Sequence, residues 1–149
     1  MKEEKYELNS LSTGITEQDG SGLLWKDIWD FKVPINQSIV LKPIDLFSAY
    51  LKGDDAAEMP NTTRIRVLRR DVANEDAKAV LNEVYYKLCK EFTDKNLLMH
   101  LSIHQPVEVG SEEHIVVQVS GLDATGIAGD TDASASFFKI LTTRKRKGL

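Results

Sequence analysis

Short runs that alternate apolar with polar side chains dominate the sequence from residue 38 onward. Thr63-Arg64-Ile65-Arg66-Val67 alternates with period two, and so does the run from Leu97 to His104. Because successive side chains of a β-strand point to opposite faces, this period predicts strands with one buried face. The other candidate strands are Ser38–Leu41, Ile44–Leu51, Val107–Val109, Ile115–Val119 and Ser136–Thr143. The chain is therefore predicted to be mainly β.

One stretch follows the helical period instead. Asn74 is a suitable N-cap, and Glu75 and Asp76 place negative charge in a first helical turn. Apolar residues then recur at helical spacing: Ala77, Val80, Leu81, Val84, Tyr85, Leu88 and Phe92. We expect one α-helix over about residues 75–93. The predicted fold class is a β-sandwich or jelly roll flanked by this helix, and a mixed α+β sheet is the alternative.

The N-terminal segment differs in composition from the rest. Within residues 1–22 only Tyr6, Leu8, Leu11 and Ile15 are bulky and apolar, so the segment cannot offset its ordering entropy alone. The chain has 149 residues, 42% of them hydrophobic, which suffices for one ordinary core. The predicted organisation is an extended polar N-terminal arm (1–22), a single β-rich domain (23–143) and a basic C-terminal tail (144–149).

Both tryptophans lie in the segment GLLWKDIWDF, directly after the arm. As a strand, this segment would place Leu23, Trp25, Trp29 and Phe31 on one face; as a helix, it would put both tryptophans beside an apolar stripe. Either arrangement closes the domain's own core or anchors the arm on an adjoining protein, because tryptophan dominates interface hot spots. Trp25, Trp29 and Phe31 are therefore candidate partner-binding residues.

The charges are distributed unevenly. Residues 1–30 carry three Lys and seven Asp or Glu, a net charge of −4, whereas residues 140–149 carry four cations and no acid. In identical copies, such ends can attract one another between subunits. The basic candidates for partner binding are Arg64 and Arg66 on one strand, and Arg144, Lys145, Arg146 and Lys147 in the tail. The overall charge of −4 argues against a protein that coats nucleic acid.

Metal-ligand patterns are weak. His100 and His104 would lie about 13 Å apart on a strand, too far to share an ion. Asp123, Asp130 and Asp132 alternate like calcium ligands, but no glutamate closes an EF-hand loop. We predict no metal and no cofactor.

Catalytic patterns are equally weak. Cys89 falls beside the apolar stripe of the predicted helix, which favours a buried, inert thiol. Glu112, Glu113 and His114 are consecutive, so on a strand neighbouring side chains would point to opposite faces. No nucleophile elbow, Walker loop or dinucleotide fingerprint occurs, and the chain is predicted not to be an enzyme.

The sequence also bears on location. Cys89 is the only cysteine, so no internal disulfide can form. The first twenty residues lack the apolar run of a signal peptide, and no stretch of about 18 uncharged apolar residues occurs. We expect a protein that is not secreted by a signal peptide and does not bind a membrane.

A β-rich body, an extended polar arm and a basic tail of opposite charge together resemble the layout of capsid-associated proteins of viruses and tailed phages. Decoration and minor capsid proteins of this kind have β-sandwich bodies that exchange arms around a symmetry axis. The resemblance implies a structural subunit, located in the virion or a cytoplasmic assembly, that stabilises a shell. Its implied partners are its own copies, with a trimer as one candidate, and a shell protein such as a major capsid protein.

Two other functions remain open from the sequence. A monomeric binding module would use the loops 53–61 and 121–135, or the basic strand, to bind a ligand or nucleic acid. An enzyme with an unrecognised site would draw on His100, His104, His114 and the loop aspartates.

Overall fold

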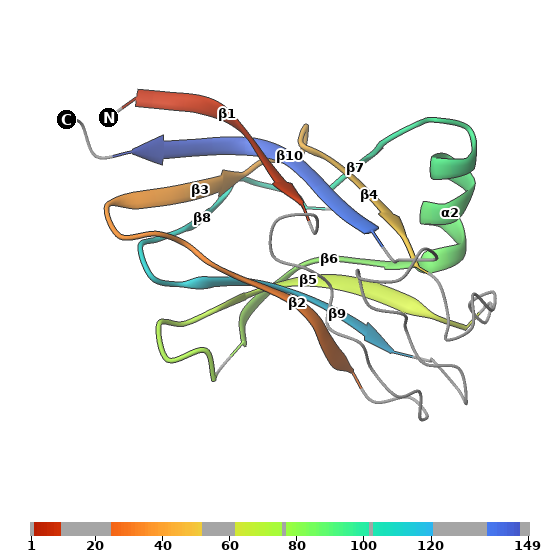
Figure 1. The fold of residues 1–149 in the computed structure, drawn as a ribbon, viewed down its shortest axis with the longest axis horizontal. Coiled ribbons are helices and arrows are strands. Elements are labelled where there is room, and N and C mark those ends of the chain that lie inside the picture. Colours follow the sequence, from red (N-terminus) through yellow and green to blue (C-terminus); the bar gives the residue numbers. More distant parts are fainter. Residues whose placement is uncertain are drawn as a thin grey trace.

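The computed structural model describes residues 2–9, 25–51, 62–75, 77–101, 103–120 and 137–146. Within these ranges the chain forms two β-sheets that lie face to face, with a helix at one flank (Figure 1). The larger sheet contains β1 (Lys2–Asn9), β3 (Gln37–Leu41), β4 (Leu46–Tyr50), β7 (Met99–His100), β8 (Val107–Val109) and β10 (Phe137–Arg146). The four-stranded sheet contains β2 (Lys26–Lys32), β5 (Arg64–Arg70), β6 (Ala77–Tyr85) and β9 (His114–Ser120). The helix is α2 (Tyr86–Asp94).

In the larger sheet, two pairs of short strands lie end to end, and each pair occupies a single strand position. β3 and β4 both pair antiparallel with β10, through Val40 opposite Thr143 and Leu46 opposite Leu141. β8 pairs with β3, and β7 pairs with β4, so β8 and β7 together occupy the next strand position. The sheet therefore has four strand positions: β1, β10, β3 with β4, and β8 with β7.

The connectivity of these strand positions defines a jelly roll. If the eight strand positions of the two sheets are numbered in chain order, the larger sheet has the order 1-8-3-6 and the four-stranded sheet the order 2-7-4-5. Consecutive positions thus alternate between the two sheets, except at the β5–β6 hairpin. This is the eight-strand, two-sheet pattern of a jelly roll. The predicted mainly β fold is confirmed, and the sheets do not form the mixed α+β arrangement.

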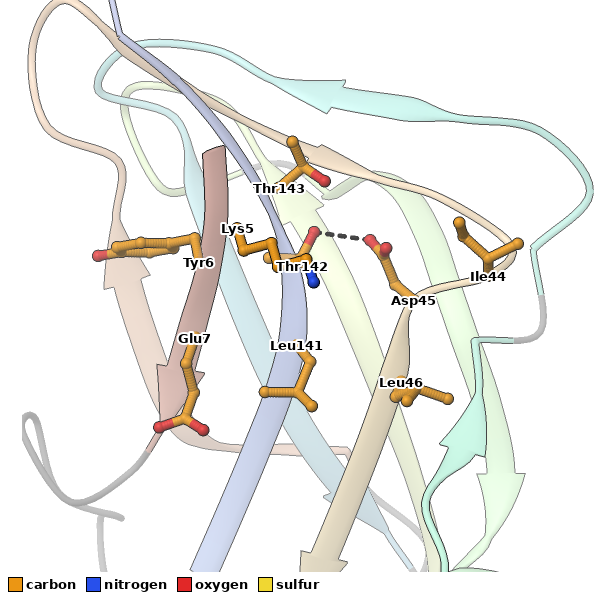
Figure 2. Close-up of a pocket in the computed structure, with 9 residues that line it drawn as sticks. All are labelled: Lys5, Tyr6, Glu7, Ile44, Asp45, Leu46, Leu141, Thr142 and Thr143. Atoms are coloured by element: carbon orange, nitrogen blue, oxygen red, sulfur yellow. Dashed lines mark hydrogen bonds between the residues drawn. The ribbon is translucent and has the colours of Figure 1, made fainter. Parts of the chain in front are cut away.

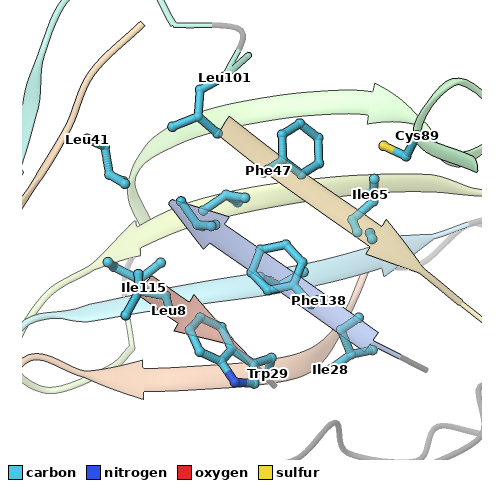
Figure 3. Close-up of a cluster of buried hydrophobic side chains, with 14 of the residues drawn as sticks. Leu8, Ile28, Trp29, Leu41, Phe47, Ile65, Cys89, Leu101, Ile115 and Phe138 are labelled. Carbon is cyan, nitrogen blue, oxygen red and sulfur yellow. The ribbon is translucent and has the colours of Figure 1, made fainter. Parts of the chain in front are cut away.

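The core fills the space between the two sheets (Figure 3). Trp29 of β2 and Phe138 of β10 bring their ring centroids to 5.4 Å, which joins the sheets near the middle of the sandwich. Phe47 of β4 is 1% exposed. Alternate residues of β9 and β5 face them, and the remaining core side chains include Ile28, Leu41, Ile65, Ile115, Val117 and Ile140.

The predicted helix is only half right. Residues 77–85 form β6, and the helix begins at Tyr86 and ends at Asp94. β6 pairs with β5 through two register shifts, one between Val67 and Leu68 and one between Arg69 and Arg70. Each bulge inserts an extra residue into β6, so its apolar positions lose period two and imitate helical spacing.

The helix is joined to the sheet through Tyr86. The Tyr86 backbone N–H donates to Thr63 O at 2.9 Å, in place of a side-chain cap. Its hydroxyl accepts a hydrogen bond from Leu51 N at 2.8 Å, and burial raises the pKa of that hydroxyl. These bonds fix the start of α2 against the end of β4.

The predicted strand over residues 97–104 is shorter than expected. Only Met99 and His100 pair with β4, although Met99 and Leu101 are buried as the alternation predicted. Leu97 is 52% exposed, because its N–H bonds to Phe92 O and ends the helix. The first residues of the predicted strand, from Leu97, therefore belong to the turn that ends the helix instead.

Residues 2–9, placed in the predicted arm, form an antiparallel ladder with β10 of the same chain, from Lys2 opposite Arg146 to Asn9 opposite Lys139. Arg144–Arg146, placed in the predicted tail, belong to that ladder. The polar segment gains order because the sheet supplies its backbone hydrogen bonds. Residues 10–24 and 147–149 lie outside the described residues.

No helix in the described ranges is long and apolar enough to span a membrane.

Candidate functional site

The outer face of the four-stranded sheet carries a continuous polar network, which we call the polar face. Its members are Trp25, Asp27, Arg64, Arg66, Arg70 and Gln118. Arg64 and Arg66 alternate along β5 with the core residues Ile65 and Val67, so strand period two directs them outward. Arg70 lies four residues after Arg66 and therefore on the same side of the strand.

A bulge in β2 separates the aromatic residues that the strand reading had placed on one face. Its pairing with β9 shifts between Asp27 and Trp29. Trp29 and Phe31 consequently lie inward, with stacked rings 5.9 Å apart, whereas Trp25 lies on the polar face. The prediction that Trp25, Trp29 and Phe31 share one face of a strand is therefore wrong, because the extra residue reverses the side on which the later residues lie.

Trp25 is covered by two predicted basic residues. The Arg66 guanidinium carbon lies 3.9 Å from the Trp25 ring centroid, and that of Arg64 lies 5.9 Å away. Arg64 also lies 5.5 Å from the ring of Tyr85 and pairs with Glu83. The structure thus brings Trp25, Arg64 and Arg66 together in a cation–π cluster.

Asp27 is the electrostatic centre of the polar face. Arg70 donates to both of its carboxylate oxygens at 2.6 and 2.9 Å, and Gln118 Nε2 donates to Oδ1 at 2.6 Å. Burial raises the pKa of Asp27, but these hydrogen bonds and the charges of Arg70 and Arg66 outweigh it, so the pKa lies below its usual value. Arg66 Nε donates to Gln118 Oε1 at 2.9 Å and links Trp25 to this centre.

A second cluster fastens the β5–β6 connection across the same sheet. His114 Nδ1 lies 2.7 Å from Asp30 Oδ1, and Asn74 donates to Asp30 Oδ2 at 2.6 Å. Asn74 has a φ of 58°, a left-handed conformation that Asn tolerates better than most residues. The loop between β5 and β6 is thereby tied to β2.

The predicted basic tail meets the acidic N-terminal residues within one chain. Arg144 donates to Glu4 Oε1 from Nε at 2.9 Å and stacks on Tyr6 at 4.3 Å. Arg146 Nε lies 2.9 Å from Glu4, and Lys145 Nζ lies 3.9 Å from Glu3. The sequence predicted that these opposite charges attract between subunits, whereas the structure pairs them within one chain, between β1 and β10. Lys147 lies outside the described residues.

The weaker catalytic and metal candidates that the structure describes do not converge. Among the described residues, no three His, Cys, Asp or Glu side chains form a group that could hold a metal ion. His100 bonds to Ile44 O, and His104 is exposed. Asp123, Asp130 and Asp132 lie outside the described residues.

The candidate nucleophile and the Glu–Glu–His run have structural surroundings. Cys89 is fully buried in the core, and burial raises the pKa of its thiol to about 12. Glu113 binds Arg69 and Gly110 N, whereas His114 binds Asp30.

Sequence reasoning missed Asp27, Arg70 and Gln118 as members of the network. The only signal was spacing: Asp27 lies two residues after Trp25, and Gln118 lies between the apolar Val117 and Val119. Period two places such residues on the outer face, but their convergence requires the order β2-β9-β5, which is a long-range property.

An eight-strand jelly roll is the architecture of viral capsid domains, among other proteins. Two solved structures share it with this chain over its full length. The first is VP17, a capsid protein of bacteriophage P23-77, with a TM-score of 0.66 and 7% identity over 100% of this chain and 99% of that one. The second is the complex of VP16 and VP17, the two major capsid proteins of this phage, with a TM-score of 0.67 and 7% identity over 99% and 100%.

The likeness predicted from the layout of the chain, to capsid-associated β-sandwich proteins, is thus confirmed at the level of the fold. No family model matches the sequence, and no curated protein matches it.

Proposed function

We propose that the protein is a structural subunit of a virus capsid. The observation that carries this proposal is coverage: the match to VP17 takes in 100% of this chain and 99% of that one, so the two folds correspond from end to end. Surface features support a binding role as well, because Tyr85, 57% exposed, and Arg64, with a side chain 42% exposed, lie together on the four-stranded sheet and belong to the types enriched at interface hot spots.

The partners follow from the same role. In a shell the protein binds its own copies and a second capsid protein of different sequence. The likeness to a complex of two major capsid proteins supports the second partner. The proposed location is the virion.

Labelling of particles tests the role. Antibodies raised against the purified protein should bind virus particles released by cells that carry its gene, as seen by immunogold electron microscopy. The molar ratio of this protein to the most abundant shell protein then distinguishes two roles. A major capsid protein would be present in a comparable amount, whereas a decoration or minor capsid protein would be present at a small fraction of it. Recovery of the protein only in the soluble fraction, with unlabelled particles, contradicts a capsid role.

Exchange of β1 between copies is the finer part of the proposal. β1 is an edge strand, and the 15 residues 10–24 would span roughly 50 Å if extended, enough to reach a neighbour. A neighbour's β10 would offer the same ladder and the same ion pairs as the chain's own, so the exchange costs little. Light scattering measures the resulting oligomer, for which a trimer is one candidate.

Single-cysteine variants test the exchange. Glu3 faces Lys145 in the ladder, so a mixture of Glu3→Cys and Lys145→Cys proteins should form disulfide-linked heterodimers if strands exchange. A mixture of Glu7→Cys and Lys145→Cys, which are out of register, serves as the control. Absence of heterodimers in the matched mixture rules out exchange and leaves the capsid role to the labelling experiment.

A further inference from the structure

The outer face of the six-stranded sheet is hollowed where β3 gives way to β4 (Figure 2). The hollow has a volume of about 580 Å³. Leu141 of β10 and its pairing partner Leu46 of β4 form an apolar floor, and Ile44, 74% exposed, lies at the rim. An apolar depression with an exposed isoleucine is a surface on which another apolar group would be buried favourably.

Two polar groups of the hollow have bonding capacity left. Asp45 is 7% exposed, and its Oδ2 accepts hydrogen bonds from Lys42 N at 2.9 Å and the Thr142 hydroxyl at 2.6 Å. Its Oδ1 has no hydrogen bond, and the Lys5 ammonium no ion pair, with any residue that the structure describes. Lys5 and Asp45 come from opposite sides of β10 (Figure 2), so the hollow offers one donor and one acceptor above an apolar floor.

The turn between β2 and β3 has the complementary chemistry. Ile35 is 67% exposed at its tip, and Asn36 follows it with a φ of 64°. Backbone bonds hold the turn in shape: Gln37 N donates to Pro34 O at 3.2 Å, and Val33 N donates to Glu113 O at 2.9 Å. A turn that is already rigid loses little conformational entropy when it binds.

We propose that the β2–β3 turn of one copy docks in the hollow of a second copy. Ile35 packs on Leu46 and Leu141, and the Asn36 amide donates to Asp45 Oδ1 while its oxygen accepts from the Lys5 ammonium. The two surfaces of this contact differ, so each copy can bind one neighbour through its turn and another through its hollow. Such a head-to-tail contact extends into rings or arrays, as a shell requires, and it therefore rests on the proposed function.

Charge substitutions at exposed positions test the contact without disturbing the fold. Ile35→Asp alters the turn and Ile44→Asp alters the hollow, whereas Val72→Asp, at a position 57% exposed on the β5–β6 loop, is the matched control. Sedimentation velocity over a concentration series should show self-association weakened roughly tenfold or more in the first two variants and unchanged in the third. Equal behaviour of all three variants, or a wild-type protein that stays monomeric, overturns the contact.

Disulfide trapping provides an independent readout. A mixture of Ile35→Cys and Ile44→Cys proteins should yield heterodimers, and a mixture of Val72→Cys and Ile44→Cys proteins should not; the native Cys89 is fully buried. Particles that carry the protein but assemble normally with Ile35→Asp would refute the contact and leave the capsid role intact. Unlabelled particles would instead refute the capsid role.

Discussion

The two outer faces of the sandwich differ in how they satisfy their polar groups. On the four-stranded sheet, Arg70, Asp27 and Gln118 bond to one another, and Arg66 covers Trp25. On the six-stranded sheet, one carboxylate oxygen of Asp45 has no hydrogen bond with any described residue and lies beside an apolar floor. The bonds on the four-stranded sheet are made within one subunit and stabilise it, although Arg70 Nε is buried there without a hydrogen-bond partner among the described residues. Unfilled bonding capacity next to apolar surface, in contrast, marks a place that another molecule completes. The following experiments test this contrast.

Removal of the Asp27 carboxylate is expected to have the largest effect. Asp27→Ala leaves Arg70, whose side chain is 14% exposed, and the Gln118 amide without their acceptor. We expect the free energy of unfolding to fall by about 2 kcal/mol, less than for a fully buried pair because Asp27 is half-exposed. Urea denaturation measures the loss. The exposed Glu91→Ala on α2 is the control, and an equal, small change in both variants would show that the polar face contributes no stability.

The contact between β1 and β10 is expected to contribute less. Arg144→Ala removes the hydrogen bonds to Glu4 and the stacking on Tyr6, and should lower the free energy of unfolding by about 1 kcal/mol. The loss should shrink at high salt, because these groups are partly exposed. Lys139→Ala on the same strand is the control, since Lys139 forms no ion pair with the residues that the structure describes. Equal losses in both variants would argue against a specific role for Arg144.

Lowering the pH should gradually reduce the contribution of the polar face to the free energy of unfolding. The pKa of Asp27 is lowered in the folded state, so its stabilisation is complete above the unfolded value of about 3.9 and is lost as the pH falls through the folded value. The difference in unfolding free energy between wild type and Asp27→Asn should therefore shrink between neutral pH and about pH 2. Urea midpoints across this range give the difference, and a constant difference would contradict the network.

Lys5→Ala is expected to leave the stability of the isolated subunit unchanged within about 0.5 kcal/mol. Its ammonium has no ion-pair partner among the described residues, so its removal breaks no described ion pair. Thermal unfolding of the purified variant measures this. A clear loss of stability would mean that Lys5 serves the subunit itself and would weaken the contrast between the two faces.

The local sequence pattern was sufficient to predict those strands in which apolar and polar residues alternate regularly. Arg64 and Arg66 alternate with core residues, and their segment is β5 as predicted. The final strand was placed almost correctly, because the buried Phe138 and Ile140 alternate with the half-buried Lys139 and Leu141. In such segments the buried face alone determines the period.

Bulges account for the errors that the sequence could not avoid. The shift between Asp27 and Trp29 separates two tryptophans that a regular strand would place together, and the two shifts in β6 imitate a helix. A bulge is specified by the partner strand and by the turn that follows, which lie far away in the chain. The same limit applies to the polar face and to the hollow, since both need strands from distant parts of the chain.

The position of β10 also bears on how the chain is made. The strand lies between β1 on one side and β3 and β4 on the other, yet it is the last of the described strands to be synthesised. Until residues 137–146 have left the ribosome, β1, β3 and β4 have no common partner, and their open edges can pair with other nascent chains. The larger sheet therefore closes only after β10 has been synthesised, and slow translation between β9 and β10 would prolong the time in which these open edges are prone to aggregate.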